Sequence, residues 1–200
     1  MFWKAVAAVL FAVAAAAPVG AATLTHEARE LHDWVLKERD HQGRPFAIVD
    51  KKAARIYVFD AQGRVQGASS VLIGQAPGDD SAPDVGEHTQ QGAVPFDERT
   101  TPAGRFASEP GINRAGEHIV WVDYDAAFAI HRLRPGRSKA DRERRLVSAD
   151  PARHRASYGC VVVPVRFYKQ VVQRWLGSQH AVVYVMPENG DMRELFGQQL

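Results

Sequence analysis

The chain has 200 residues, of which 46% are hydrophobic and 24% are charged. This composition excludes an intrinsically disordered protein, because there are enough apolar side chains to build a core. The formal net charge of +2 is too balanced to indicate a nucleic-acid-binding protein, so we expect no nucleic acid among the partners.

Residues 1–22 are typical of a secretory signal peptide. Lys4 supplies a short positive region, residues 5–17 are apolar, and small residues follow as far as Ala22. The apolar run is shorter than the roughly 20 residues of a membrane-spanning helix, so we expect cleavage after Ala21 or Ala22. An uncleaved membrane anchor is the alternative. The sequence therefore predicts a periplasmic or secreted protein, whose remaining chain fits one domain.

Residues 23–44 are predicted to form an N-terminal amphipathic helix and a linker. Between residues 25 and 39, the apolar side chains Ala28, Leu31 and Val35 recur at helical spacing. We expect this face to be buried against the edge of the main domain, which is predicted to span residues 45–200.

Short β-branched and aromatic runs predict that strands dominate the main domain. The runs cover residues 45–50, 54–60, 65–74, 118–124, 126–131 and 181–187. Glycine, proline and polar residues predict a long loop with little regular structure from 74 to 97. Helices are predicted over residues 137–147, 164–176 and 191–200. Most strands look hairpin-connected, so we expect a mainly β sandwich or barrel with a few peripheral helices.

The charge is distributed unevenly along this domain. Residues 79–98 contain six acids and no lysine or arginine, whereas residues 132–155 contain nine bases and three acids. Solvated loops or helix faces are one interpretation of both segments. The other is a polar rim around a charged ligand.

The only cysteine, Cys160, lies in the stretch RASYGCVVVP. A single thiol cannot close an intramolecular disulfide, so a reactive thiolate and a small buried hydrophobic residue are the two interpretations. Gly159 would allow backbone N–H groups to approach a substrate closely, as an oxyanion hole requires. Ser157 and Tyr158 add hydrogen-bonding side chains beside the thiol.

A reactive cysteine needs a base, and His131 is the candidate because it ends the apolar run AAFAI. A strand that finishes in histidine presents the imidazole at the rim of a sheet, although a structural edge histidine is the alternative. His154 is closer in the sequence but lies between two arginines. A zinc site formed by these histidines and Cys160 lacks paired-ligand spacing, so we expect no metal.

Three ordered elements resemble the L,D-transpeptidase (YkuD-type) catalytic domain family. TTPAGRF at residues 100–106 resembles the family's TPxGxF element, and AIH at His131 followed by SYGCVVVP resembles its His and S/T-x-G-C signature. The hairpin over residues 54–74 is similar to its opening strands. The resemblance covers roughly residues 46–187.

The resemblance implies acyl transfer on peptidoglycan stem peptides, which would serve as donor and acceptor, with no cofactor. Cys160 would attack the donor carbonyl, and His131, oriented by a backbone carbonyl, would take the thiol proton. Backbone N–H groups around Tyr158, Gly159 and Cys160 would stabilise the oxyanion. A hydrolase that uses the same cysteine and a degenerate peptide-binding domain without turnover are the alternatives.

This chain departs from the family's pattern in three places. Residues 133–155 look like a basic insertion, Tyr158 stands where many members have histidine, and Val162 stands where arginine or asparagine is common. Arg132 and Arg134 directly follow His131 and are candidates to bind the donor's carboxylates. A solvated surface segment is the alternative.

Overall fold

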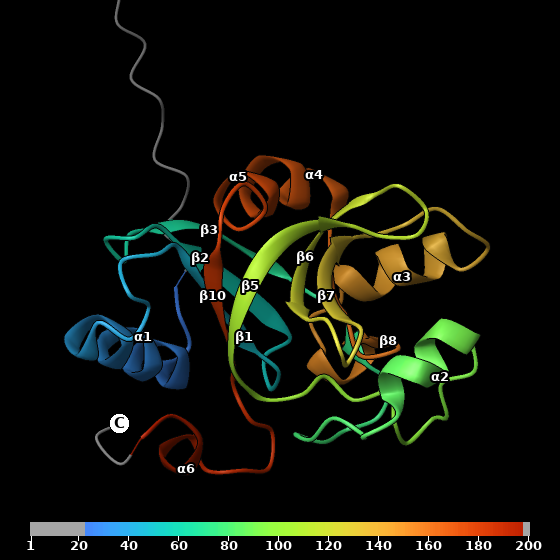
Figure 1. Ribbon diagram of the computed structural model, residues 1–200, viewed down its shortest axis with the longest axis horizontal. Coiled ribbons are helices and arrows are strands. Elements are labelled where there is room, and N and C mark those ends of the chain that lie inside the picture. The colour runs from blue at the N-terminus through green and yellow to red at the C-terminus, as the bar shows by residue number, and fades with distance from the viewer. Residues whose placement is uncertain (1–22, 198–200) are drawn as a thin grey trace, which may run out of the picture.

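The computed structural model describes residues 23–197 (Figure 1). The predicted signal peptide, residues 1–22, lies outside the described residues. Among those that are described, the strands form the frame and short helices lie around it, which confirms the predicted mainly β class. No helix in this part of the chain is long and apolar enough to cross a membrane.

A curved sheet of eight strands forms the frame of the molecule, in the order β3-β2-β1-β10-β5-β6-β7-β9. The strands are β1 (Phe46–Asp50), β2 (Arg55–Phe59), β3 (Val65–Ser70), β5 (Gly104–Ile112), β6 (His118–Asp123), β7 (Phe128–Arg132), β9 (Val161–Val163) and β10 (Ala181–Val185). The pairs β1–β10 and β7–β9 are parallel, and the other neighbours are antiparallel. A separate parallel pair joins β4 (Ile73–Gly74) to β8 (Arg155–Ser157).

The sheet curls around one main core and nearly closes on itself. Alternate residues of β1, β2, β6, β7, β9 and β10 point into this core. The N–H of Leu72 donates to the carbonyl of Val162 at 2.8 Å, and the N–H of Val162 donates back at 2.9 Å. Strand β9 is therefore bonded on both sides, to β7 and to the segment that follows β3.

The predicted amphipathic helix is α1 (His26–Glu38), and its predicted buried face is confirmed. Ala28, Leu31 and Val35 are fully buried, and the Thr25 hydroxyl caps the helix by accepting from the N–H of Ala28. Together with α6 (Met192–Phe196), α1 covers the second face of β1, β2 and β10 (Figure 1).

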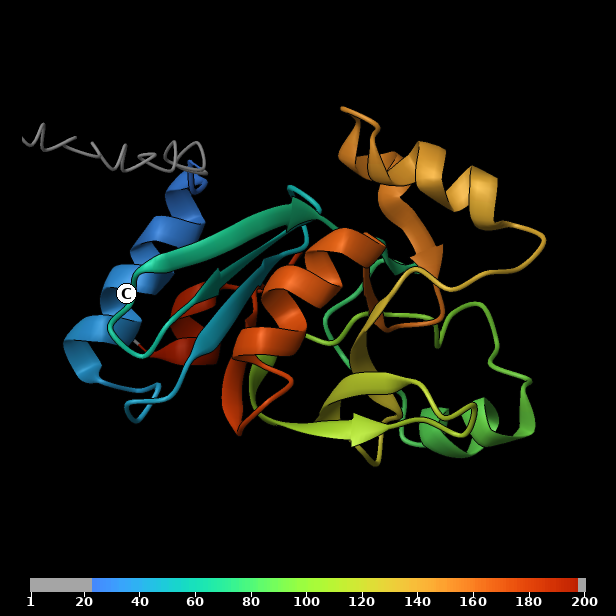
Figure 2. The same ribbon diagram turned by 90° about the horizontal axis from the view of Figure 1, so that it is seen from above.

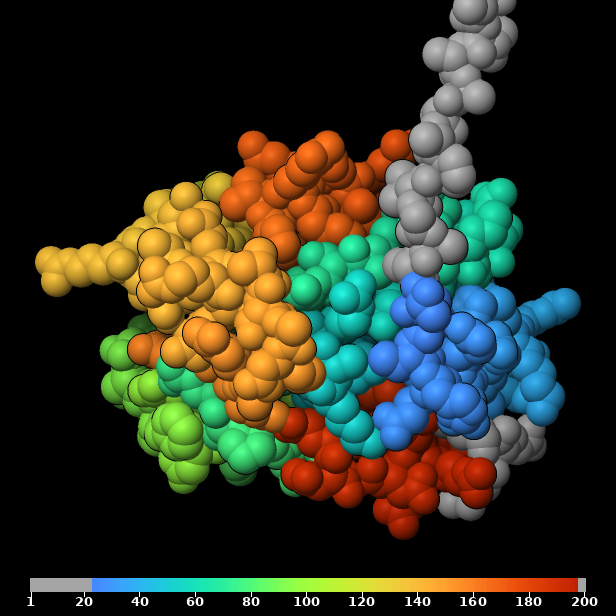
Figure 3. Space-filling model, turned by 180° about the vertical axis from the view of Figure 1, so that it is seen from behind, coloured from blue at the N-terminus to red at the C-terminus, as the bar shows by residue number. Residues whose placement is uncertain are grey.

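The predicted helix over 164–176 is confirmed as the consecutive turns α4 (Val165–Phe167), η2 (Tyr168–Val172) and α5 (Gln173–Trp175). It lies across the curved sheet in the view from above (Figure 2) and buries Tyr168, Val172 and Leu176 in the main core. The predicted charged helix is α3 (Lys139–Leu146), followed by the 3₁₀ turn η1 (Pro151–His154). From behind, this segment stands out at the opposite end of the molecule from α1 (Figure 3).

The predicted long loop from 74 to 97 contains one helix that the sequence did not predict, α2 (Val85–Gln91). Local composition disfavours this helix, since a glycine lies in its first turn. Its first residues, Val85 and Gly86, are nevertheless buried, so tertiary packing selects the helix. The predicted strand over 65–74 is also divided, because β3 ends at Ser70 and β4 begins at Ile73.

Candidate active site

The predicted nucleophile and base come from adjacent parallel strands. His131 in β7 is paired with Val162 in β9, and Ile130 is paired with Val161. Ile130 and Val161 point into the main core, so His131 faces the other side of the sheet. Cys160 directly precedes β9 and is two positions before Val162, the residue paired with His131.

His131 is almost fully buried and is held by its own strand. Its Nδ1 atom lies 2.9 Å from the carbonyl oxygen of Arg132. A carbonyl can only accept, so Nδ1 carries the ring proton and Nε2 of the neutral imidazole has a free lone pair. Burial lowers the pKa of His131 to about 4, and the charges of Arg134 and Arg142 act in the same direction. The imidazole is therefore neutral near pH 7.

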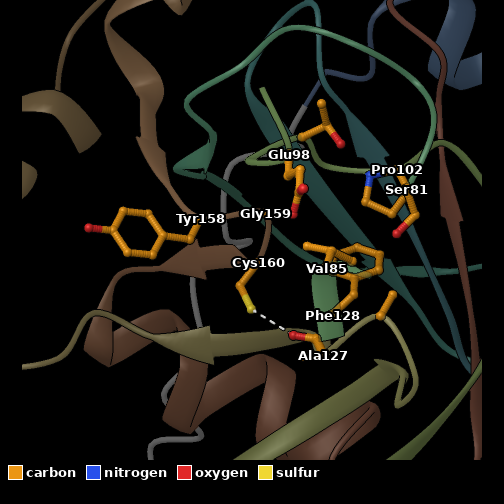
Figure 4. Close-up of a pocket in the computed structure, with 11 residues that line it drawn as sticks. Ser81, Val85, Glu98, Pro102, Ala127, Phe128, Tyr158, Gly159 and Cys160 are labelled. Atoms are coloured by element: carbon orange, nitrogen blue, oxygen red, sulfur yellow. Dashed lines mark hydrogen bonds between the residues drawn. The ribbon is translucent and has the colours of Figure 1, made fainter. Parts of the chain in front are cut away.

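The thiol of Cys160 is half-buried and has one hydrogen-bond acceptor among the described residues. Sγ donates to the carbonyl of Ala127 at 3.5 Å, the contact drawn in Figure 4. Ala127 has a φ of +51°, a left-handed conformation that costs an L-residue about 1–2 kcal/mol. This strained turn between β6 and β7 aims the carbonyl at the thiol. No hydrogen bond joins Sγ to His131 within residues 23–197.

Two opposing influences set the protonation state of this thiol. Burial raises the pKa of Cys160, whereas the N–H groups of Ala129 and of Cys160 itself, together with the charge of Arg134, lower it. Burial dominates, so the thiol is protonated at rest while the imidazole of His131 is neutral. This arrangement suits general-base catalysis, in which the proton moves during attack.

The structure assigns different contacts to the three residues predicted around the oxyanion. The Ser157 hydroxyl donates to the carbonyl of Cys160 at 2.6 Å and accepts from the N–H of Gly159 at 3.2 Å. Both the Ser157 side chain and the Gly159 N–H are therefore engaged within the loop. The Tyr158 ring points away from the thiol (Figure 4), and the Arg99 guanidinium lies over it at 4.1 Å.

Gly159 requires glycine for two independent reasons. Its φ of +122° is rarely adopted by L-residues, and a Cβ atom there would lie 2.8 Å from the carbonyl oxygen of Thr100. The Cys160 loop is thus pressed directly against the TTPAGRF segment.

The thiol lies in a narrow, covered pocket. The pocket is lined by Ser81, Val85, Glu98, Thr100, Pro102, Ala126, Ala127, Phe128, Tyr158, Gly159 and Cys160. Its free volume is about 10 Å³, which is near the minimum for one water molecule. The cover is formed by residues 81–102, including the start of α2. At its rim, His88 Nδ1 lies 2.6 Å from Glu98 Oε2, and this carboxylate raises the pKa of His88.

Gly86 lets the α2 segment pack closely on the β6–β7 turn. A Cβ atom at this position would lie 1.9 Å from the carbonyl oxygen of Asp125, two residues before Ala127. The cover and the turn that contacts the thiol therefore touch each other.

Arg132 and Arg134, the predicted carboxylate ligands, both pair with Glu117 at the start of β6. Arg132 Nη2 lies 2.5 Å from Glu117 Oε1, and Arg134 Nε lies 2.9 Å from Glu117 Oε2. Side chains alternate along β7, so Arg132 faces away from His131. Arg134 is the one whose charge acts on both Cys160 and His131.

Sequence reasoning missed Glu117, Ala127 and Thr101 as parts of this site. Glu117 and Ala127 lie in turns whose composition carries no signal of the distant partner. Thr101 lies in the TTPAGRF motif, and its buried hydroxyl donates to the carbonyl of Gly159 at 2.7 Å. The presence of a hydroxyl residue in the TTPAGRF motif was the one feature of the sequence that could have indicated this contact.

His154 lies apart from this pair in its contacts. Its ring nitrogens lie 2.8 Å from the carbonyl of Val71 and 3.1 Å from that of Ser148, so it ties the basic segment to the sheet. Within the described chain, no group of three or more His, Cys, Asp or Glu side chains is arranged to hold a metal ion.

Comparison with known proteins gives structural neighbours alone. No family model and no curated protein sequence matches the chain. Its structural neighbours include L,D-transpeptidases. The catalytic domain of the E. faecium L,D-transpeptidase is 16% identical, with a TM-score of 0.39, over 72% of this chain and 98% of that one. The Xylanimonas cellulosilytica L,D-transpeptidase is 16% identical, with a TM-score of 0.42, over 72% and 60%.

A further neighbour is the helical cell shape determining protein Pgp2 from Campylobacter jejuni. It is 15% identical, with a TM-score of 0.46, over 80% of this chain and 56% of that one. The chain thus spans about three fifths of the X. cellulosilytica and C. jejuni chains. L,D-transpeptidase catalytic domains, the family that the motifs resemble, are the recurrent neighbours.

Proposed function

We propose that the protein is a cysteine-dependent L,D-transpeptidase that transfers acyl groups between peptidoglycan stem peptides. The observation that carries the proposal is the relation of Cys160 to His131. Cys160 directly precedes β9, the strand paired with the one that carries His131, and the Nδ1 contact with Arg132 leaves Nε2 able to accept the thiol proton. The motif resemblance around these two residues supports the choice of substrate.

The reaction begins with attack of Sγ on the carbonyl carbon of a stem-peptide bond. The thiol leaves the Ala127 carbonyl, its proton passes to His131 Nε2, and a tetrahedral oxyanion forms. The N–H of Cys160 is the main donor to this oxyanion, because Ser157 occupies that of Gly159. The carbon–nitrogen bond then breaks, His131 protonates the leaving amine, and a thioester remains.

The second half of the reaction restores the enzyme. An acceptor amine attacks the thioester, His131 takes its proton, and the carbon–sulfur bond breaks with return of that proton to Sγ. Substrate entry requires the α2 segment to move, since the pocket has room for little more than one water.

One observation favours a second candidate, a cell-wall peptide-binding domain without turnover. Burial raises the pKa of the thiol, and Sγ already donates to a backbone carbonyl. In that function Cys160 is a packing residue and stays unreactive when peptides bind.

The proposed substrate and the signal-like residues 1–22 together place the working protein outside the cytoplasm, in the periplasm or secreted. In this proposal residues 23–44 are an N-terminal helix and linker, and residues 45–200 form the catalytic domain. Neither a cofactor nor a metal takes part.

The deciding experiment is intact-mass spectrometry of the protein after incubation with a carbapenem. Sγ should open the β-lactam ring and give one adduct per chain, which Cys160→Ala abolishes and His131→Gln slows by about 10²–10⁴-fold. Incubation with a stem tetrapeptide, with and without an acceptor amine, then separates transfer from hydrolysis. An unmodified protein whose thiol also resists alkylation supports the binding domain instead.

A further inference from the structure

Thr101 occupies a buried position between the two loops that shape the site. Its side chain donates to the carbonyl oxygen of Gly159 at 2.7 Å and accepts from the N–H of Gly74 at 2.8 Å. The residue is 2% exposed, so water does not compete for these bonds. The hydroxyl thereby ties the nucleophile loop to the end of β4.

Lys51 holds Thr101 from the opposite side. Its ammonium group is fully buried and donates to the carbonyls of Gly78 and Thr101 at 2.7 and 2.8 Å, and to Asp79 Oδ1 at 2.6 Å. Three donors meet three acceptors, so the ammonium is fully satisfied. The position of Thr101 is therefore set by a charged group that packing keeps in one place.

Asp79 completes the anchor. Its carboxylate accepts from the N–H groups of Glu188, Asn189 and Gly190 at 2.7–3.0 Å, just after β10. These bonds and Lys51 keep the pKa of Asp79 below its usual range, although burial opposes them. The chain of contacts thus runs from the central sheet to the carbonyl of Gly159.

The geometry of the next peptide bond connects this chain to the chemistry. The Gly159 carbonyl and the Cys160 N–H belong to one planar trans peptide unit, so they point in opposite directions. When Thr101 holds the carbonyl on the buried side, the N–H must point to the other side, where Sγ lies.

We infer that Thr101 is a positioning residue that orients the Cys160 amide as the oxyanion donor, and that Lys51 and Asp79 hold Thr101 in place. The inference rests on the proposed function. It assigns to the threonine of TTPAGRF a role in transition-state stabilisation, beyond its place in the segment that precedes β5.

The test compares Thr101→Val, which keeps the shape and removes the hydroxyl, with Thr101→Ser, which keeps the hydroxyl. Ser108→Ala is the matched control, because Ser108 is equally buried in β5 but its hydroxyl has no hydrogen-bond partner among residues 23–197. Two rates are measured for each protein: carbapenem acylation by intact mass, and Cys160 alkylation by iodoacetamide as a function of pH.

Thr101→Val should acylate about 10²-fold more slowly, the effect of losing one oxyanion donor. Its alkylation profile should shift to higher pH, because the N–H no longer faces the sulfur. Thr101→Ser should restore both readouts to within a few-fold, and Ser108→Ala should match the wild type. Wild-type rates in a folded Thr101→Val protein would overturn the inference, as would a Thr101→Ser protein as slow as the valine variant.

If Thr101→Val does not fold, Thr101→Ala gives the same comparison with room for a bridging water. If neither folds while Thr101→Ser does, the hydroxyl serves folding and the inference fails. A wild-type protein that no carbapenem acylates would refute the proposed function alone, because the alkylation profiles still report the orientation of the amide.

Discussion

The imidazole of His131 donates through Nδ1 to the carbonyl of Arg132, its own neighbour in β7. A base oriented by the main chain depends on strand geometry and not on a third side chain. The charge of Glu117 favours the imidazolium, but burial and the charges of Arg134 and Arg142 outweigh it, so the positive charge is acceptable only while it is transient. This explains why a neutral pair, rather than a preformed thiolate–imidazolium pair, is the resting state.

The low pKa of His131 predicts a specific dependence of stability on pH. Below pH 6.5 the unfolded chain binds a proton at this position, whereas the folded chain does so only near pH 4. Stability that is present above pH 6.5 is therefore lost as the pH falls to 4, by roughly 3 kcal/mol for this group. Urea denaturation from pH 7 to 4 should show a smaller loss in His131→Gln than in the wild type.

The exposed His180 provides a matched substitution control, and His180→Gln is measured in parallel. Equal slopes for His131→Gln and the wild type would show that the buried imidazole does not resist protonation.

Substitution of Gly86 tests whether the α2 segment limits access to the thiol. A Cβ atom would collide with the Asp125 carbonyl, so Gly86→Ala must push α2 away from the β6–β7 turn. We expect Cys160 to react several-fold faster with a bulky maleimide, and the rate with a small alkylating reagent to change less. Thr89→Ala, on the exposed face of α2, should behave as the wild type. Unchanged maleimide rates in Gly86→Ala would mean that the segment does not restrict entry.

The adjacent lysines 51 and 52 should differ sharply in their contribution to stability. Lys51 is fully buried and bonded to three oxygens, so Lys51→Met leaves buried acceptors and Asp79 without their partner. We expect a loss of about 3–5 kcal/mol in the free energy of unfolding. Lys52 forms an exposed pair with Glu27, and Lys52→Met should cost no more than about 1 kcal/mol. Similar urea midpoints for the two variants would contradict the buried network.

Arg134 and Arg132 share Glu117 but should affect the thiol differently. The charge of Arg134 lowers the pKa of Cys160, whereas Arg132 faces the other side of the sheet. Arg134→Ala should therefore shift the pH profile of Cys160 alkylation to higher pH, and Arg132→Ala should leave it in place. If both variants had the same profile, the charge acting on the thiol would come from elsewhere.

The same two variants also test the carboxylate-binding hypothesis. Each guanidinium already has a carboxylate partner in Glu117, so a substrate carboxylate would have to compete with it. Removal of a true ligand should raise the KM for the stem-peptide donor more than it lowers kcat. An unchanged KM in both variants would mean that the two arginines have a structural role and do not bind the donor.

Local patterns in the sequence predicted the elements whose burial follows a simple period. The face of α1 with Ala28, Leu31 and Val35 is an example. Packing between distant segments was not visible. The helix α2 forms because Val85 and Gly86 pack on the β6–β7 turn, and no local signal announces that contact.

The polar contacts of the site also divide into those that the sequence predicted and those that join distant segments. Cys160 and His131 could be predicted as site residues because their chemistry and their place beside apolar runs are visible in the sequence alone. The pairing of Glu117 with two arginines, and the links from Lys51 through Thr101 to Gly159, join residues that are far apart in the sequence. Such contacts depend on the order of the strands in the sheet. The prediction of hairpins from the sequence does not give that order, because β1 pairs with the distant β10.

The parallel pairing of β1 with β10 also has a consequence for how the chain acquires its fold. The centre of the sheet joins β1, near the start of the chain, to β10, near its end. This pairing cannot form until nearly the whole polypeptide has emerged. Long-range pairing of this kind slows folding. A chain that emerges N-terminus first, from a ribosome or through a membrane pore, therefore stays unfolded and able to pass through the pore until its final segment appears.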